Sequence, residues 1–420
     1  YYTKERVTAE VAEQEERKVP FLMQLKAVFT DKYMLLLLGY FLLYTLTSQL
    51  KNVALPYYCN YVLGTYSDGI TQTLVSVLGG IPMGIGIFAV WPLAKKFGKK
   101  NITVVGFILY AFGSAVCWTA PTNLYIVLVG QFIKNIGGLP CAYVFMALFS
   151  DALDNLEWKN GFRCDGTAMS VYSVIITAAA GLVTGIFNGG LSAAGYLAPE
   201  TVSVMPELTD AMQKIITNAD GTFAVIFNQP DAVNTIFTFF FVGLEAIAGL
   251  VYAFMLTPVT VEKTVNKKLV IIRARQKAEC EARGEVWVEP EIRAAEEQKK
   301  MDAEAEEIYR KELKERCEKK GIDYDAALEK HIEAVRVKQE KQTEKERLAK
   351  IKAEEKSKIS ADKKAAKLAK MSPEQRAKYD ARQEKKARRD EEKWQKERAE
   401  GEVCYEKMQK TLANAEAKKN

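Results

Sequence analysis

Six runs of mostly uncharged residues constrain the fold of this chain more than any other feature. Each run has at least 18 residues, and at about 1.5 Å per residue that is close to the roughly 30 Å hydrocarbon layer of a bilayer. Backbone N–H and C=O groups inside lipid must bond internally, so apolar runs of this length predict helices. We therefore predict an all-α membrane protein with six transmembrane helices, at residues 33–50, 70–94, 102–120, 122–149, 168–196 and 233–257.

The charge of the chain changes abruptly after the last of these runs. Residues 1–260 contain 15 Lys and Arg against 17 Asp and Glu, a net charge of −2, whereas residues 261–420 contain 44 against 36, a net charge of +8. The first part is apolar and aromatic, and the second has few large hydrophobic residues. We predict a cytoplasmic linker over 1–32, a membrane domain over 33–257 and a charged, partly helical cytoplasmic tail over 258–420.

The short loops between the runs predict the orientation in the membrane. The loop after the second run carries four lysines between residues 95 and 100, and the loop after the fourth carries Lys159 and Arg163. The loops after the first, third and fifth runs contain only Lys51 and Lys214 as basic residues. Since cytoplasmic loops are enriched in Lys and Arg, we expect both termini on the cytoplasmic side of a cell membrane.

Two segments outside the runs allow a coarser prediction. Residues 198–232 form an extracytoplasmic loop, for which we predict a short helix near Glu207–Thr217. The tail favours helix, but its apolar residues are too sparse for a sustained coiled-coil seam. Either the tail is solvated or its excess of positive charge binds the inner leaflet of the membrane. The acidic residues interleaved with the basic ones favour a solvated tail. Helix breaks are expected at Gly284, Pro290, Gly321, Pro373 and Gly401.

The residue types that build metal sites and enzyme active sites are scattered. Seven cysteines include no CxxC pair, and the only histidine, His331, has no Cys or His neighbour at ligand spacing. No nucleophile lies beside a general base in the pattern of an enzyme. We predict no metal site, no cofactor and no enzymatic activity. We also predict that the chain contacts membrane lipid and does not bind nucleic acid.

A polar strip, DALDNLEWKNGFRCDG (151–166), lies between the fourth and fifth runs. With Pro140 and Tyr143 before it, the strip carries the series D-x-x-D-x-x-E-W-K-x-G-x-R, and a Gly-Tyr pair closes the run that follows. This pattern resembles the glycoside–pentoside–hexuronide cation symporters, a family of the major facilitator superfamily. The matching positions are Pro140, Tyr143, Asp151, Asp154, Glu157, Trp158, Lys159, Gly161, Arg163, Gly166, Gly195 and Tyr196.

The resemblance covers about residues 1–260 and maps onto helices seven to twelve of the family's twelve. It implies the C-terminal half of a transporter that moves a sugar or glycoside with a cation, Na⁺ or H⁺, by alternating access. The partner is then an N-terminal six-helix half, in which most cation ligands of the family lie. Two alternatives stay open: a six-span half-transporter that acts as a homodimer, and a non-transporting membrane anchor whose tail recruits partners.

Two positions depart from the family pattern. The family commonly has Tyr after the second Asp of the strip, where this chain has Asn155. Several members carry a Lys on their eleventh helix, where this chain has Thr177. The second departure leaves the mode of cation coupling open.

The charges of the strip suit a gate that opens and closes. Surface ion pairs are weak enough to form in one transporter state and break in another. An ordinary solvated loop is the alternative, but the positive-inside rule does not explain its acids. We predict that a cytoplasmic gate is formed by Asp151, Asp154, Glu157, Lys159 and Arg163.

Polar residues also recur within the runs. Ser170, Ser173, Thr177, Thr184 and Asn188 follow helical spacing, which fits either a water-filled cavity or plain helix packing. In the family the corresponding helix faces the sugar path. Amide, hydroxyl and aromatic groups suit a polyhydroxylated ligand, although core packing is equally open for the tyrosine of the first run. We predict that the substrate is bound by Tyr44, Gln131, Asn135, Tyr143, Tyr172, Ser173 and Thr177.

Two charges lie deep within predicted spans, where an unpaired charge is costly. Lys134 lies about 18 Å and Glu245 about 16 Å along helices that enter from the same side. We predict that the two pair or share a polar pocket and serve in coupling, with Lys134 supplying the positive charge absent at Thr177. The alternative is a snorkelling lysine and a neutral carboxyl group.

Overall fold

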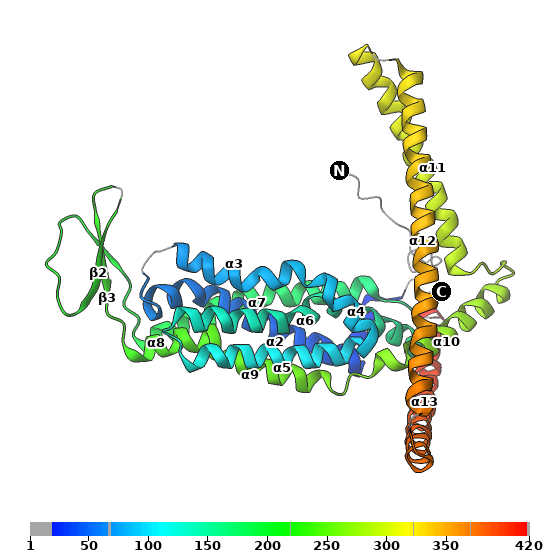
Figure 1. Ribbon diagram of the computed structural model, residues 1–420, viewed down its shortest axis with the longest axis horizontal. Coiled ribbons are helices and arrows are strands. Elements are labelled where there is room, and N and C mark those ends of the chain that lie inside the picture. The colour runs from blue at the N-terminus through cyan, green and yellow to red at the C-terminus, as the bar shows by residue number, and fades with distance from the viewer. Residues whose placement is uncertain (1–18, 66–68, 219, 322, 370, 418–420) are drawn as a thin grey trace. The chain divides into compact units, whose positions relative to one another are not determined.

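The computed structural model describes residues 19–65, 69–218, 220–321, 323–369 and 371–417. The described residues divide into two compact units. One comprises those within Arg17–Arg275 and Gly401–Asn420, and the other those within Gln276–Glu400. The first unit contains a bundle of long helices that run alongside one another, shown lying horizontally in Figure 1.

Five helical segments among the described residues are long and apolar enough to cross a membrane. Three are single helices: α5 (Lys99–Thr119), α6 (Leu124–Asn160) and α7 (Asp165–Ala194). Two contain π-helical turns: α2 (Lys32–Tyr57) continues into η1 (Tyr58–Val62), and α8 (Asp231–Thr238) continues through η2 (Phe239–Gly243) into α9 (Leu244–Leu256). The prediction of an all-α, multi-pass membrane fold is confirmed.

The second predicted span is not one continuous helix. Residues 70–94 are divided between α3 (Gly69–Ile85) and α4 (Ile87–Phe97), which follow one another along the bundle in Figure 1. Pro82 and Pro92 lie inside these helices and lack the N–H that would continue the hydrogen-bond ladder. The break falls at Gly86, where a Cβ atom would lie 2.3 Å from Leu139 on α6. Proline and close packing therefore interrupt the span.

The segment before the first span is partly helical. Residues 1–18 of the predicted linker lie outside the described residues, but Phe21–Thr30 form α1, whose Ala27 and Val28 are buried. Asp31 then caps α2, since its carboxylate accepts hydrogen bonds from the backbone N–H groups of Tyr33 and Met34 at 2.9 and 3.0 Å. The end of the linker thus packs onto the bundle.

The predicted helix near Glu207–Thr217 is wrong, because this loop forms a three-stranded antiparallel sheet. Its strands are β1 (Glu200–Val202), β2 (Met212–Thr217) and β3 (Phe223–Phe227), in the order β1-β3-β2. Gly221, with φ +81°, lies in the turn between β2 and β3. Ile215 pairs with Val225, and pairing of β-branched residues across strands outweighs the local helix preference of β2.

The described residues of the tail form four helices: α10 (Val261–Ala282), α11 (Pro290–Lys320), α12 (Tyr324–Ala369) and α13 (Pro373–Ala417). Breaks occur at Gly284, Pro290, Gly321 and Pro373, as expected, but α13 runs through Gly401. A Cβ atom at Gly401 would lie 2.0 Å from the Trp158 ring, so this glycine serves close packing rather than a break.

His331 of the tail packs within the second unit. Its Nε2 lies 3.1 Å from Glu306, and its ring is stacked 4.0 Å from Tyr309. The hydrogen bond with His331 lowers the pKa of the Glu306 carboxyl group. No group of His, Cys, Asp and Glu that could hold a metal ion is found in the described part of the chain.

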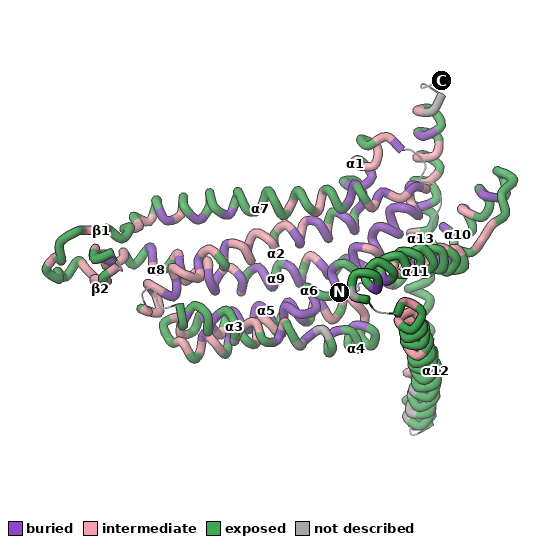
Figure 2. Tube along the Cα trace, turned by 90° about the horizontal axis from the view of Figure 1, so that it is seen from above, coloured by how far each residue is buried: buried purple, intermediate pink, exposed green. Residues whose placement is uncertain are grey.

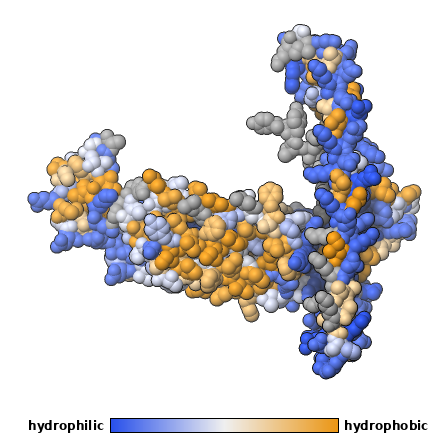
Figure 3. Space-filling view, viewed as in Figure 1, coloured by the Kyte–Doolittle hydropathy of each residue, from blue (hydrophilic) through white to orange (hydrophobic). Residues whose placement is uncertain are grey.

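Burial differs sharply between two neighbouring helices of the bundle. In the most apolar stretch of α6, 67% of residues are buried, against 17% in α7. Figure 2 shows α7 along an edge of the bundle with exposed residues over most of its length. The outer face of the bundle in Figure 3 is largely hydrophobic, as a lipid-facing surface requires.

Candidate functional site

Glycines bring α5 and α6 unusually close together. A Cβ atom at Gly113 of α5 would lie 2.3 Å from the backbone N of Lys134, and one at Gly137 of α6 would lie 2.3 Å from the backbone N of Tyr110. Small residues at such crossings allow helix backbones to meet inside a membrane. This contact places the Lys134 and Tyr110 side chains in the interior of the bundle.

Lys134 and Glu245 form an ion pair in that interior. The Lys134 Nζ lies 2.7 Å from the Glu245 Oε2, and both residues are 1% exposed. The Tyr110 hydroxyl donates to the Glu245 Oε1 at 2.5 Å, and the Lys134 Nζ lies 5.3 Å from the Tyr110 ring centroid. The lysine therefore does not snorkel, and the carboxylate has a partner at each oxygen.

A second lysine, Lys51, lies inside a spanning segment. It belongs to the helical segment Lys32–Val62, and its Nζ lies 5.7 Å from the Phe241 ring centroid. The end of the apolar run predicts a loop at Lys51, and this prediction is wrong. The signal that could have placed it is the uncharged stretch NVALPYYCNYVL, which continues the helix beyond the lysine.

Two of the predicted substrate-binding residues lie near the buried ion pair. The Gln131 side chain is 1% exposed and donates to the Cys117 Sγ at 3.8 Å. Tyr44 interacts electrostatically with Glu245, and its ring lies 5.9 Å from that of Tyr252. Both face the interior of this chain's own bundle.

The other predicted substrate-binding residues lie elsewhere. The Tyr143 hydroxyl donates to the Met83 carbonyl, and Tyr172 is stacked on Phe41 at 4.4 Å. Asn135 is half-buried on α6, whereas Ser173 and Thr177 are exposed on α7. The structure of this chain thus does not bring the seven residues into one pocket.

The polar stripe of α7 lies on an open face. Each hydroxyl of Ser170, Ser173, Thr177 and Thr184 donates to the carbonyl four residues earlier, at 2.8–3.1 Å. All four residues are exposed. The stripe is therefore not used as glue between the described helices of this chain, and its hydroxyl oxygens can still accept hydrogen bonds.

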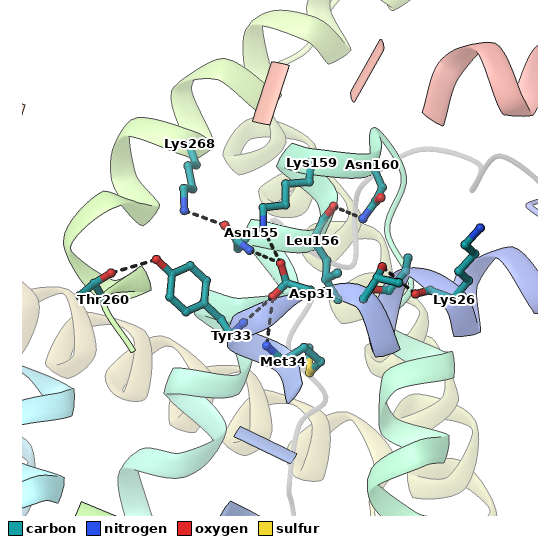
Figure 4. A network of polar contacts seen from close by, with 12 residues as sticks. Lys26, Asp31, Tyr33, Met34, Asn155, Leu156, Lys159, Asn160, Thr260 and Lys268 are labelled. Atoms are coloured by element: carbon teal, nitrogen blue, oxygen red, sulfur yellow. Dashed lines mark hydrogen bonds and ion pairs between the residues drawn. The ribbon is translucent and has the colours of Figure 1, made fainter. Parts of the chain in front are cut away.

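A network centred on Asp31 ties α2 to α6 and α10 at the end of the bundle that carries the polar strip (Figure 4). The Asp31 carboxylate accepts from the Lys159 Nζ at 2.7 Å and from the Asn155 Nδ2 at 2.8 Å. The Asn155 Oδ1 in turn accepts from Lys268 at 2.6 Å. Lys268 is fully buried, with its Nζ 4.8 Å from the Trp158 ring centroid.

The remaining charges of the strip form two further groups. Arg163 lies 2.8 Å from Asp165, 3.4 Å from Glu157 and 3.8 Å from Asp154. In the other group, Lys99 of α5 pairs with Asp151 at 2.8 Å. All five predicted gate residues therefore take part in ion pairs.

Glu262 of α10 fixes the start of α5 beside these ion pairs. Its carboxylate accepts the backbone N–H groups of Lys99 and Lys100 at 2.7 and 3.1 Å. A carboxylate at a helix N-terminus is favoured by the helix dipole and by the free N–H groups there. This contact holds α10 against the bundle.

Comparison with known proteins places the chain among transporters. The family model described as MFS/sugar transport protein matches residues 1–256, which is more than half of the chain. The chain belongs to this family. Among relatives, an isoprimeverose transporter of Lactiplantibacillus pentosus is 28% identical over 244 residues, which cover 55% of this chain and 48% of the relative.

Other relatives are similar in extent. The uncharacterized symporter YjmB of Bacillus subtilis is 26% identical, over 46% of this chain and 41% of that protein. A putative sulfoquinovose importer of Escherichia coli is 28% identical, over 43% of this chain and 38% of that protein. This member of the sugar transport family thus spans about half the length, or less, of the relatives it matches. The family and these relatives are transporters, not enzymes.

In this family member, sequence reasoning missed the partners of the strip. Asp31, Lys99 and Lys268 are distant from the strip along the chain, and only Asp31 carried a local signal, its place as an N-cap before the first apolar run.

Burial raises the pKa of the Cys164 thiol to about 12, helped by the neighbouring Asp165. The thiol next to these charges therefore stays protonated and is not a nucleophile.

Proposed function

We propose that this chain forms one six-helix half of a transporter that moves a sugar or glycoside with a cation, Na⁺ or H⁺, by alternating access. The family match over residues 1–256 supports transport, and relatives named for isoprimeverose and sulfoquinovose support a sugar substrate. The observation that carries the proposal is the exposed polar face of α7. Only 17% of its apolar stretch is buried, against 39–67% in the other four spanning segments.

The exposed face of α7 has the chemistry of a sugar site. Ser173 and Thr177 offer hydroxyl groups, and next to them in the chain is Tyr172, which is half-buried and stacked on Phe41. Sugars are bound by hydrogen-bonding groups together with an aromatic face, and transporter sites of this superfamily lie between two halves near the membrane midplane. In our proposal Tyr172, Ser173 and Thr177 line the substrate path, whereas Tyr44 and Gln131 face the interior of the bundle and add no group to this face.

The ion pairs at the polar strip form the gate in this proposal. Asp151, Asp154, Glu157, Lys159 and Arg163 link α6 to α2, α5 and α7 through ion pairs whose carboxylates, apart from Asp165, are buried. In this proposal the pairs form in one transporter state and separate in another. The excess of lysine in the adjoining loops supports a cytoplasmic position for this end and for both termini.

The buried ion pair serves coupling in this proposal. Lys134 and Glu245 are 1% exposed, inside a segment of the bundle long enough to span the membrane. Ionisable residues at such depth mark ion and proton pathways in transporters. Lys134 then supplies, from α6, the positive charge that several family members carry at the position of Thr177.

An uptake assay tests the proposal. Cells expressing the complete gene, with whatever coding sequence precedes Tyr1, are given labelled glycosides with and without a Na⁺ or pH gradient. Saturable, gradient-dependent accumulation is the expected result. Uptake equal to that of vector-only cells contradicts transport and favours the alternative of a non-transporting membrane anchor. Expression of residues 1–420 alone is the matched control, because uptake by this chain without a second half indicates the homodimer.

A further inference from the structure

The two oxygens of the Asp31 carboxylate have different partners, as Figure 4 shows. Its Oδ1 accepts the backbone N–H groups of Tyr33 and Met34 and so caps α2. Its Oδ2 accepts from the Lys159 Nζ at 2.7 Å and from the Asn155 Nδ2 at 2.8 Å. One carboxylate therefore joins the start of the first spanning helix to the polar strip.

The two members of the Asp31–Lys159 ion pair differ in burial. The Lys159 side chain is 24% exposed, so water can replace the carboxylate around its ammonium group. The Asp31 side chain is 1% exposed, and a buried carboxylate that loses its partner is strongly destabilised. The free-energy cost of separating this pair therefore falls on the carboxylate.

Asn155 gives the carboxylate a second partner. It is fully buried, donates from Nδ2 to Asp31 and accepts at Oδ1 from the Lys268 Nζ at 2.6 Å. Hydrogen bonds in a chain polarise one another, so the charge of Lys268 strengthens the donation of the amide to the carboxylate. An amide suits this position, because one of its ends accepts from a cation and the other donates to an anion.

Lys268 is held in place by its surroundings. It is 0% exposed, and its Nζ lies 4.8 Å from the Trp158 ring centroid and 5.6 Å from that of Tyr33. Aromatic faces attract an ammonium group that has left water. Its helix α10 is attached to the strip by Arg275, which donates to the Trp158 carbonyl at 2.6 Å. The lysine behind Asn155 thus stays where it is when an exposed side chain of the strip moves.

We propose that Asn155 and Lys268 are positioning residues that allow the gate to open. When Lys159 separates from Asp31, the Asn155 amide, backed by the charge of Lys268, keeps the buried carboxylate hydrogen-bonded and aimed at the place to which Lys159 returns. Without them the carboxylate would depend on Lys159, and the pair would stay closed. The inference rests on the proposed function, because it needs a gate that opens during transport. It makes α10, the first helix of the tail, a part of that gate.

Amine labelling of the full chain tests the positioning without transport. The purified 420-residue chain in lipid nanodiscs is treated with an acylating reagent, and mass spectrometry gives the reaction rate at each lysine. Only the neutral amine reacts, and a carboxylate partner keeps a lysine protonated. Asn155→Leu should lower the rate at Lys159 about threefold, because the carboxylate then holds this lysine more tightly. Lys268→Met should lower it as well, since a like charge is removed and the amide donates less strongly.

Three controls accompany these variants. Asp31→Asn removes the negative charge and should raise the rate at Lys159. Asn101→Leu, at an exposed position of α5 whose amide bonds to its own helix, should leave that rate unchanged. Within the same chain, Lys99 of the neighbouring ion pair should keep its rate in the two test variants.

An unchanged or faster reaction at Lys159 in either test variant overturns the role of the residue that was replaced. A faster reaction is what a residue with a merely structural role would give, because its loss would loosen the strip. An equal fall at Lys99 also overturns the proposal. If Asn155→Leu gives no folded protein by size-exclusion chromatography, Asn155→Ser replaces it, because the shorter side chain cannot bridge the two partners. The same slower reaction is expected.

Uptake by the complete transporter tests the link to the gate. Asn155→Leu and Lys268→Met should lower kcat more than they change KM, because gate opening slows while the sugar-facing residues of α7 are untouched. A normal kcat in both variants overturns the gate role. If the wild type moves no sugar, the proposed function fails, while the labelling still decides whether Asn155 and Lys268 hold the carboxylate.

Discussion

Helices α6 and α7 follow one another in the chain and both span the membrane, yet their polar residues have opposite surroundings. On α6, Lys134 and Gln131 are 1% exposed and bond to other helices. On α7, Ser173 and Thr177 are exposed and bond to their own helix backbone. The first helix forms the core of this chain, and the second presents a surface for something outside it.

The glycines of the two helices show the same contrast. On α6, Gly130 and Gly137 face α5 so closely that a Cβ atom would lie 2.4 Å from Cys117 and 2.3 Å from the backbone of Tyr110. On α7, a Cβ atom at Gly185 would meet no atom within 4 Å. Identical residues thus serve packing within the chain on one helix and leave a smooth, open surface on the other.

The largest expected effect is the loss of the acid that pairs with α6. Glu245→Gln leaves Lys134 without its carboxylate, and removal of one partner of a buried pair costs about 3–5 kcal/mol. The double variant Glu245→Gln/Lys134→Met removes the unpaired charge and should recover most of that loss. Thermal unfolding in detergent measures both, with Glu207→Gln in the exposed loop as control. A double variant no more stable than Glu245→Gln contradicts the pairing as a source of stability.

The second largest effect is expected from a methyl group added to a glycine between α5 and α6. Gly113→Ala forces the Cβ atom against the Lys134 backbone, and overpacking of this kind costs about 1–3 kcal/mol. Gly185→Ala on α7 is the matched control and should be neutral or slightly stabilising, because alanine favours helix more than glycine does. Equal melting temperatures for the two variants would show that α5 and α6 are not tightly packed.

Loss of the Arg163 ion pairs, which lie between α6 and α7, should have a smaller effect, and it should appear in transport. Arg163→Glu removes these ion pairs and should lower uptake about fivefold, the equivalent of about 1 kcal/mol. Asp165 lies closer to Arg163 than Asp154 does, at 2.8 against 3.8 Å. The swap Arg163→Glu/Asp165→Arg should therefore restore more uptake than Arg163→Glu/Asp154→Arg. Normal uptake in Arg163→Glu removes this arginine from the gate.

The sequence carried enough information for the spans and for the depth of the buried charges. Apolar length locates α5, α6 and α7, because a bilayer imposes that length on any helix that crosses it. Helical rise alone brings Lys134 and Glu245 to one depth, and the cost of an unpaired charge then favours their contact. These features depend on the membrane and on local geometry.

The features that were missed depend on contacts between distant parts of the chain. The break at Gly86 reflects contact with Leu139, and the strand at Ile215 reflects pairing with Val225. Asn155 departs from the family pattern, and its bond to Lys268 spans 113 positions. No local pattern encodes such contacts, so single-sequence reasoning has no access to them.

The smallest expected effect on this chain tests the open face of α7 directly. Thr177→Val keeps the shape of the side chain and removes its hydroxyl. Thr177 is exposed, and its hydroxyl bonds to its own helix. The free energy of unfolding should therefore change by no more than about 0.5 kcal/mol, and the melting temperature of the chain should hardly move. If the face lines the sugar path, the complete transporter should still show a raised KM, since a lost hydrogen bond to substrate costs about 0.5–1.5 kcal/mol. Val174→Thr, the reverse change at a 65% exposed position of the same helix, is the control. Unchanged uptake in Thr177→Val would indicate that this face packs against another helix and does not contact the substrate. The contrast between α6 and α7 would then reflect which helices surround each of them and not a difference in function.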